Sequence, residues 1–445
     1  MKSDSINTYF FIGIGGVGMS ALARYCLHSG HKVYGHDKTR SDITNALICE
    51  GIQIFYKDSL DALPKFLLSE DIKVVYSAAI EFNHSQLSFY LQQGNVVMKR
   101  SEFLASLCNN KKTLAIAGTH GKTTTSLILT HFFSETKQLF TSLIGGFING
   151  NKSNLIKTGS DAFIVEADEY DRSFLQLYPT LACITSIEPD HLDIYTTKKE
   201  FLKAFIQFSS QVEKELIVSH GLPFKGITFG IDVSSDYQAK KLKKIKNGYR
   251  FDLKTPNETY KNVCLNLIGR HNVSNALAAI AIAEQSGLNA CEFLHTLENF
   301  PGVYRRMNVY KWNESIVIDD YAHHPSEIRS VYTTIRNFYP LCKNCVVFQP
   351  HLYSRTRDFM KEFSIVLSMF DEVILLDIYP AREMPIEGIN SKILLNNISQ
   401  RKKRSINKTK IRTALEESDA KIFAILGAGD IGLEIKKLNL KKIGL

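Results

Sequence analysis

Residues 113–125 read TLAIAGTHGKTTT, an apolar run followed by a glycine-rich turn and a segment rich in hydroxyl side chains. The run Thr113–Ala117 predicts a buried strand, and the segment after Gly121 predicts the first turn of a helix. A strand, a glycine-rich turn and a helix in this order bind phosphate, because free N–H groups and the positive end of the helix face the anion. The stretch therefore predicts an α/β fold with a phosphate site at a strand end.

Within this loop, Lys122 is expected to reach the β- and γ-phosphates of a nucleotide and Thr123 to bind Mg²⁺. The usual motif has a glycine five residues before Gly121, where this chain has Ile116. Gly118 stands closer, so the loop is a shortened variant. A glycine-rich turn that binds no ligand would poorly explain why Gly-Lys-Thr stands between a predicted strand and a predicted helix. The residues predicted to bind ATP here are Gly118, Thr119, His120, Gly121, Lys122, Thr123 and Thr124.

The bulk composition is that of a globular protein of two to three domains. The chain has 445 residues, of which 44% are hydrophobic and 22% charged, and no apolar run is long enough to predict a membrane span. Its eight scattered cysteines suggest a reduced, cytoplasmic protein. The net charge is +9, but the basic runs 240–246 and 401–404 lack interleaved aromatics. We therefore expect solvated surface there, with no nucleic-acid or membrane partner, and a monomer or weak homodimer.

Apolar β-branched runs alternate with helical patterns along the whole chain, which is typical of α/β proteins. Polar breaks at 108–112 and 299–302 separate three series of runs, and we predict three domains. These are a Rossmann-like domain over 1–108, a central P-loop ATPase-like α/β domain over 109–302, and a Rossmann-like α/β domain over 303–445. The predicted strands are 8–14, 32–36, 72–77, 95–98, 113–117, 162–165, 181–186, 215–219, 315–318, 345–349, 372–377 and 421–426.

A second glycine-rich turn lies near the N-terminus, where residues 9–23 read YFFIGIGGVGMSALA. Gly13, Gly15 and Gly18 have the G-x-G-x-x-G spacing of a dinucleotide-binding turn, and Asp37 follows where a ribose-binding acid is expected. A secretory signal is disfavoured by Asp4 and by the glycines within the apolar segment. The same spacing recurs at 427–432, so the motif indicates a turn that approaches a pyrophosphate. An NAD-dependent dehydrogenase remains open at this point.

Carboxylates follow two of the predicted strands in the central domain. Glu166 begins Glu-Ala-Asp-Glu after one strand, and Glu188-Pro-Asp-His191 follows another. Oxygen ligands at the carboxyl ends of strands suit Mg²⁺, which makes Glu166 a candidate ligand. His191 is a less usual magnesium ligand, and it could equally cap a helix or serve as a general polar group.

Three further segments carry polar chemistry but are weak by themselves. In 269–275, GRHNVSN, asparagine amides could read a purine edge or simply cap a helix. Tandem arginines at 305–306 could neutralise a transferring phosphoryl group. The segment 319–325, DDYAHHP, could hold a metal or line a nucleotide or substrate pocket, and arginines in 348–357 could bind a carboxylate bidentately. A nucleic-acid ATPase would leave these last segments without a role.

The motifs together resemble the Mur ligases. They are GIGGVGMS, GTHGKTTT, EADEYDRSFL, EPDHLDIY, GRHNVSNA, RRM, DDYAHHPSEI, FQPHLYSRTRD and YPAREMPIEG, in this order across nearly the whole chain. The resemblance is greatest to members that join L-alanine to UDP-N-acetylmuramate. It implies an ATP-dependent ligase with an acyl-phosphate intermediate, and Mg²⁺ as cofactor, with two ions and Mn²⁺ as a substitute.

The resemblance also implies roles for individual residues. Glu166 and His191 match the family's magnesium-site residues beside Thr123, and His271, Asn272 and Asn275 match the adenine side. Arg306 and Asp320 match nucleotide contacts, and Lys122, His191, Arg306 and His323 are the expected catalytic residues. The expected contacts to the UDP-sugar and amino acid are Gly13, Gly15, Gly16, Gly18, Asp37, Tyr321, His323 and Arg355. One departure is Leu352, where many relatives have arginine, which leaves the preference among L-alanine, glycine and L-serine open.

Overall fold

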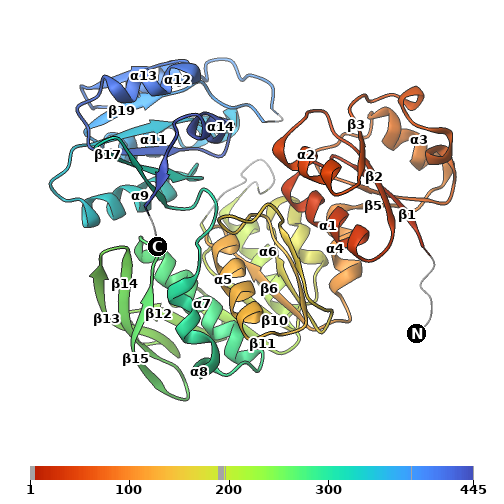
Figure 1. Cartoon of the computed structure of the whole chain (residues 1–445), viewed down its shortest axis with the longest axis horizontal. Coiled ribbons are helices and arrows are strands. Elements are labelled where there is room, and N and C mark those ends of the chain that lie inside the picture. The colour runs from red at the N-terminus through yellow and green to blue at the C-terminus, as the bar shows by residue number, and fades with distance from the viewer. Residues whose placement is uncertain (1–5, 189–194, 196, 382, 444–445) are drawn as a thin grey trace. The chain divides into compact units, whose positions relative to one another are not determined.

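The computed structural model describes residues 6–188, 195, 197–381 and 383–443 (Figure 1). Its strands form three sheets, which confirms the three-domain α/β architecture expected from the sequence. By their contacts the residues fall into two compact units. The first unit is Met1–Lys240, Leu253–Lys261 and Asn275–Leu297, and the second unit is Lys241–Asp252, Asn262–Ser274 and Glu298–Leu445.

The N-terminal sheet is parallel, with strand order β3-β2-β1-β4-β5. Its strands are β1 (Thr8–Ile12), β2 (Lys32–His36), β3 (Gln53–Phe55), β4 (Ile72–Tyr76) and β5 (Val97–Lys99). Its helices are α1 (Val17–His28), α2 (Asp42–Cys49), α3 (Ser85–Gln93) and α4 (Arg100–Cys108), with 3₁₀ turns η1 (Leu60–Ala62) and η2 (Lys65–Leu68). β1 ends two residues earlier than expected, because Gly13 has a φ of +83° and turns the chain.

The central sheet has the order β15-β14-β13-β12-β11-β10-β6-β9-β7-β8, in which β8 runs antiparallel to β7. Its strands are β6 (Thr113–Ala117), β7 (Phe140–Leu143), β8 (Leu155–Lys157), β9 (Ala162–Glu166), β10 (Leu181–Ile184), β11 (Glu215–Ser219), β12 (Ile227–Ile231), β13 (Tyr237–Ile245), β14 (Gly248–Lys254) and β15 (Thr259–Leu265). The associated helices are α5 (Lys122–Glu135), η3 (Tyr170–Gln176), α6 (Lys198–Ser210), α7 (Arg270–Gln285), α8 (Ala290–Phe293) and η4 (Leu294–Asn299).

The C-terminal sheet has the order β20-β19-β18-β21-β17-β16-β22, and β16 runs antiparallel to both of its neighbours. Its strands are β16 (Asn308–Trp312), β17 (Ser315–Asp320), β18 (Asn344–Phe348), β19 (Glu372–Leu375), β20 (Lys403–Ser405), β21 (Ile422–Leu426) and β22 (Lys441–Lys442). Its helices are α9 (Pro325–Phe338), α10 (Tyr353–Asp358), α11 (Met360–Leu367), α12 (Ser391–Asn397), η5 (Lys408–Lys410), α13 (Ile411–Glu416) and α14 (Ile431–Lys436).

Alternation along the strands divides the core between the faces of each sheet. In β1, Tyr9 and Phe11 point into one cluster and Phe10 and Ile12 into another. The first of these clusters also contains Phe163 of β9, and α1 packs against β7 and β8. The N-terminal and central sheets of the first unit are therefore joined by shared apolar packing.

Two further observations concern the whole described chain. The eight cysteines are all free. Among the described residues, no helix combines the length and the apolar character needed to cross a membrane.

Candidate functional site

The predicted phosphate loop, residues 118–121, lies between β6 and α5, so the expected order of strand, turn and helix is present. Gly118 and Gly121 have φ values of +125° and +87°. A Cβ at Gly118 would lie 2.2 Å from Thr185 Oγ1, and one at Gly121 would lie 2.4 Å from Asn275 Oδ1. Both positions therefore require glycine for backbone conformation and for space. The structure also brings Asn275, a predicted nucleotide contact on α7, against this loop.

Lys122 begins α5 and lies among carboxylates. Its Nζ donates to Gly118 O at 2.7 Å and to Glu169 Oε2 at 2.6 Å. The Glu169 side chain is only 2% exposed, against 15% for Lys122. Burial lowers the pKa of Lys122, but the charges of Glu169 and Asp168 outweigh it and the net shift is upward. Lys122 is therefore a group that is charged at neutral pH and is held inside the loop.

Thr123 and Glu166 meet at the end of β9. The Thr123 hydroxyl donates to Glu166 Oε2 at 3.2 Å, and Gly145 N donates to Glu166 Oε1 at 2.9 Å. Burial raises the pKa of the Glu166 carboxyl, and Lys122 and these two donors oppose the rise. The pair places a hydroxyl and a carboxylate within one small, oxygen-rich volume. His191, the other predicted metal ligand, lies outside the described residues.

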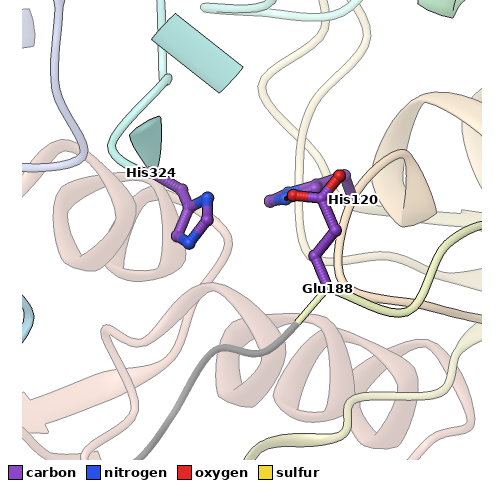
Figure 2. Close-up of side chains that lie close together, drawn as sticks. All are labelled: His120, Glu188 and His324. Atoms are coloured by element: carbon purple, nitrogen blue, oxygen red, sulfur yellow. Dashed lines mark hydrogen bonds and ion pairs between the residues drawn. The ribbon is translucent and has the colours of Figure 1, made fainter. Parts of the chain in front are cut away.

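His120 and Glu188 hold the outer part of the loop. His120 Nε2 lies 3.3 Å from Glu188 Oε2, and Figure 2 shows the carboxylate beside the ring. The Thr119 hydroxyl donates to Glu188 O at 2.9 Å, and His120 N donates to Ser186 Oγ at 2.9 Å. The segment after β10 thus fixes the loop. His324, labelled in the same figure, belongs to the second unit, where it caps α9.

The N-terminal glycine turn has its own carboxylate contact. Asp37, directly after β2, accepts a hydrogen bond from Gly15 N at 2.8 Å. Gly16 is the N-cap of α1 and makes no side-chain cap hydrogen bond, and the first turn of α1 holds no acidic residue. A Cβ at Gly18 would lie 3.1 Å from Arg100 Nη1. Asp37 and Arg100 therefore both lie against the turn that is predicted to approach a pyrophosphate.

Arg100 is not among the site residues predicted from the sequence. It begins α4, and its Nη2 lies 3.4 Å from Asp168 Oδ2. Asp168 belongs to the acidic segment that also contains Glu166 and Glu169. The only sequence signal was a basic residue directly after a strand, which by itself distinguishes nothing. Its partner is 68 positions away, so the contact arises from packing of the two sheets within the first unit.

His271 and Asn272, the other residues predicted on the adenine side, lie in the second unit. Asn272 Nδ2 donates to Ile268 O at 2.8 Å, so this amide supports the first turn of α7. A Cβ at Gly269 would lie 2.5 Å from His271 Cε1. Gly269 therefore leaves room for the imidazole.

In the second unit, the tandem arginines differ sharply in environment. Arg305 is 6% exposed, pairs with Asp319 at 3.1 Å and donates to Gly427 O at 2.7 Å. Arg306 lies 3.6 Å from Glu327 Oε1, and its guanidinium lies 5.2 Å from the centre of the Tyr321 ring. Arg305 is therefore a buried structural cation, whereas Arg306 is the more accessible of the two.

Asp320 ends β17 and organises the turn around it. Its carboxylate accepts from Met307 N at 2.6 Å and from Ala322 N at 2.7 Å. Burial raises the pKa of Asp320 to about 6, with Arg306 and the two N–H donors opposing the rise and Glu327 adding to it. This predicted nucleotide contact is buried, and its two backbone bonds connect the segments that carry Arg306 and Tyr321.

In the second unit, Tyr321 and His323 follow β17, and Arg355 lies on α10. His323 Nδ1 is 3.0 Å from Tyr321 O, and its ring centre is 5.9 Å from that of His351. Arg355 Nη1 is 3.3 Å from His351 Nδ1. The structure therefore brings the three predicted residues together through His351. Leu352, the departure from the family pattern, is buried with a φ of +71°.

Side chains of the protein itself bond to the second G-x-G-x-x-G segment, 427–432. Gln349 Oε1 accepts from Ile431 N at 3.0 Å, and Arg305 donates to Gly427 O. A Cβ at Gly432 would lie 2.7 Å from Arg305 Nη1. The repeated spacing thus serves a tight strand-to-helix turn closed by side chains.

Comparison with known proteins gives a consistent result over the whole chain. The model described as "Mur ligase family, catalytic domain" matches residues 8–112, "Mur ligase middle domain" matches 116–283, and "Mur ligase, glutamate ligase domain" matches 305–431. A UDP-N-acetylmuramate–L-alanine ligase of Christiangramia forsetii is 45% identical over 98% of both chains. One of Flavobacterium psychrophilum is 45% identical over 99% of both. A crystal structure of such a ligase from Thermotoga maritima superposes with a TM-score of 0.82 at 25% identity, covering 97% of this chain and 98% of that one.

Proposed function

Because the chain belongs to the Mur ligase family, we propose that it joins L-alanine to the carboxylate of UDP-N-acetylmuramate with cleavage of ATP to ADP and phosphate. The observation that carries the proposal is the phosphate loop with Lys122 against Gly118 O and Thr123 against Glu166. Relatives that share this chain's full length are named for this reaction. The product is an intermediate of peptidoglycan synthesis.

The nucleotide is assigned to the first unit's loop. The backbone N–H groups at the start of α5, which begins at Lys122 and has no side-chain cap, would face the phosphates. Lys122, charged because Glu169 and Asp168 hold its pKa up, offsets the charge on the transferring phosphoryl group. Asn275 is assigned to the adenine side together with His271 and Asn272, and Arg306 and Asp320 of the second unit are assigned to the nucleotide.

Mg²⁺ fits the donor set that the structure shows. Thr123 offers a hydroxyl and Glu166 a carboxylate, both oxygen donors of the kind that magnesium prefers. The burial that raises the pKa of Glu166 would be offset by a divalent charge. Bound there, Mg²⁺ supplies charge neutralisation of the nucleotide phosphates. We assign His191 to a second ion, with Mn²⁺ able to replace Mg²⁺.

The UDP-sugar is assigned to the glycine turn of the N-terminal sheet. Gly13, Gly15, Gly16 and Gly18 allow backbone to approach the diphosphate, and Asp37 follows β2 where a ribose-binding acid is expected. This assignment gives the turn a ligand without nicotinamide. Tyr321, His323 and Arg355 are assigned to the amino-acid and sugar end, where Arg355 would bind a carboxylate.

The proposed chemistry has two substitutions. A carboxylate oxygen of the sugar attacks the γ-phosphorus of ATP, the bond to the β,γ-bridging oxygen breaks, and ADP leaves. The amine of L-alanine then attacks the acyl phosphate, loses a proton, and forms the amide as phosphate leaves. Lys122 stabilises charge in the first step, and His323 is the group assigned to position the amine. Exclusion of water protects the acyl phosphate between the two steps.

The proposed domain bounds are those of the sequence, 1–108, 109–302 and 303–445. We also propose a monomer or weak homodimer located in the cytoplasm, where free cysteines are typical. Light scattering of the purified chain across a concentration series tests the oligomeric state.

The test of function is ATP consumption by the purified chain with UDP-N-acetylmuramate and a panel of amino acceptors. We expect turnover to be fastest with L-alanine, slower with glycine and L-serine, and absent without an acceptor. Preference for the L-alanyl-γ-D-glutamyl-diaminopimelate tripeptide would instead indicate the peptide-recycling branch of the family. Reduction of NAD⁺, followed at 340 nm, would contradict the ligase assignment altogether.

A further inference from the structure

Asn154 occupies an unusual position in the first unit. It is the last residue of the loop 144–154 that joins β7 to β8, and its side chain is only 3% exposed. Its Nδ2 donates to Val17 O at 2.5 Å and to Ser20 Oγ at 3.3 Å, and its Oδ1 accepts from Arg24 Nη1 at 2.8 Å. One buried amide from the central sheet thus makes three contacts to α1, directly after the N-terminal glycine turn.

Arg24 continues this connection into the N-terminal sheet. It is 1% exposed, and its Nε and Nη2 make a bidentate pair with Glu50, the C-cap of α2, at 2.8 to 3.0 Å. A buried guanidinium is stable only when its donors are paired. Because one of those donors is satisfied by Asn154, the packing of α1 and α2 depends on the β7–β8 loop.

The other end of the same loop meets the phosphate site. Gly145 N donates to Glu166 Oε1 at 2.9 Å, and a Cβ at Gly146 would lie 2.4 Å from Thr123 Cγ2. Ile144 N donates to Asn154 O at 3.2 Å, so the two ends of the loop are bonded to each other. One short, closed loop therefore contacts Glu166 at one end and Val17, the first residue of α1, at the other end.

We propose that Asn154 is a positioning residue that sets the glycine turn of the UDP-sugar relative to Glu166 and Thr123. The effect on turnover that we expect from this inference rests on the proposed function. Each ligand would bind mainly to its own segment, but the sugar carboxylate must stand in line with the γ-phosphate. A displacement of about 1 Å between reacting groups can cost about 100-fold in rate.

The test compares two alanine substitutions in this one loop of the full chain. Asn154→Ala removes all three amide contacts. Asn151→Ala is the control, because Asn151 is exposed and its side-chain Oδ1 accepts from Ser153 N, inside the loop. We expect Asn154→Ala to lower kcat at least tenfold while KM for ATP and for UDP-N-acetylmuramate stays within threefold. Asn151→Ala should match the wild type.

Asn154→Asp provides a second reading if the alanine variant fails to fold. It keeps an oxygen that accepts from Arg24 and loses the donor to Val17 O, and we expect the same loss of kcat with unchanged KM values. A kcat within threefold of wild type in the folded variant, or an equal loss in Asn151→Ala, overturns the proposal. So does a change confined to the KM values.

Amide hydrogen exchange of the full chain gives a readout that needs no turnover. Asn154→Ala should raise exchange about tenfold both in 144–153 and in 17–20, since each loses a buried hydrogen-bonding partner. Asn151→Ala should raise exchange in the loop alone. A wild-type chain that is inactive with every amino acceptor would refute the proposed function. The exchange measurement would still test whether Asn154 connects the loop to α1. Unchanged exchange at 17–20 in Asn154→Ala overturns the connection.

Discussion

The ammonium group of Lys122 lies 2.6 Å from a carboxylate oxygen of Glu169, and both side chains are largely removed from solvent. This pair connects the start of α5 with the acidic segment that follows β9. It keeps a positive charge beside the loop glycines at neutral pH, because Glu169 and Asp168 raise the pKa of Lys122 above its usual value.

Replacement of Lys122 should therefore affect catalysis and stability separately. Lys122→Ala is expected to lower kcat by about 10²–10³-fold, the usual cost of losing one stabilising charge or donor. Calorimetry should show unchanged binding of UDP-N-acetylmuramate. Lys111→Ala, which removes an exposed lysine near β6, is the control.

Lys122→Ala should also lower Tm, because it leaves the buried carboxylate of Glu169 without Lys122. Adding Glu169→Gln to this variant should restore Tm but not kcat. Phosphate release near the wild-type rate in Lys122→Ala would contradict the assignment.

Glu166→Gln should change the metal requirement. The amide keeps an acceptor for Gly145 N but loses the negative charge, so the concentration of Mg²⁺ at half-maximal rate should rise at least about tenfold. Titration of Mg²⁺ at saturating ATP measures it. Asp161→Asn, which changes an exposed carboxylate directly before β9, should leave the requirement unchanged. An identical Mg²⁺ curve for wild type and Glu166→Gln would remove Glu166 from the proposed metal site.

Gly121→Ala separates steric fit from backbone strain. The added Cβ would lie 2.4 Å from Asn275 Oδ1, and the residue would keep a φ of +87°. Gly94→Ala has a similar φ of +80° but meets no atom within 4 Å, so it isolates the conformational cost of about 1 kcal/mol. We expect ATP binding to be lost in Gly121→Ala and retained in Gly94→Ala, both by calorimetry. Equal ATP affinity in the two variants would show that contact with Asn275 is unimportant.

His36 and His84 should make the first unit sensitive to acid. Their rings are 4.7 Å apart, and His84 Nδ1 lies 3.2 Å from Asp58 Oδ1. Burial lowers the pKa of both, and the charge of His84 lowers that of His36 further, while Asp58 opposes the shift at both and Asp37 opposes it at His36. Below about pH 6.5 the unfolded chain binds protons that the folded chain excludes, so stability is lost as pH falls.

The corresponding measurement is Tm between pH 7.5 and 5. A His36→Gln/His84→Gln variant should lose less Tm over this range than the wild type, and His220→Gln, an exposed histidine, should behave like the wild type. A wild-type curve parallel to that of the double variant would show that the histidine pair does not control the acid sensitivity.

Much of the fold could be predicted because buried strands have a local signature. The runs at 32–36, 113–117 and 215–219 are strands with the expected bounds, and several others differ by one or two residues at their ends. No predicted strand covers β3, β7, β8, β12, β13, β14, β15, β16, β20 or β22. Four exposed lysines, Lys240, Lys241, Lys243 and Lys244, lie on β13, so the strand lacks the apolar run that identifies a buried one.

The candidate site divides in the same way. The positions of Lys122, Thr123 and Glu166 follow from local rules, because a glycine turn precedes a helix and acids follow strands. Glu169 as the partner of Lys122, Asn275 against Gly121 and His351 between His323 and Arg355 could not be read from the sequence. Each of these is a contact between segments whose spacing along the chain carries no information about distance.

The sequence by itself determined the strand–turn–helix units, their α/β class and the family, since backbone conformation and apolar periodicity are set within a few residues. Only the tertiary structure decided which polar groups are buried together. Arg24 and Asn154 are ordinary residues in sequence, separated by 130 positions, yet packing of α1 on β7 and β8 removes both from water and obliges them to bond. Desolvation is a property of the folded chain, and it is desolvation that turns these two side chains into a connection between the glycine turn and the phosphate loop.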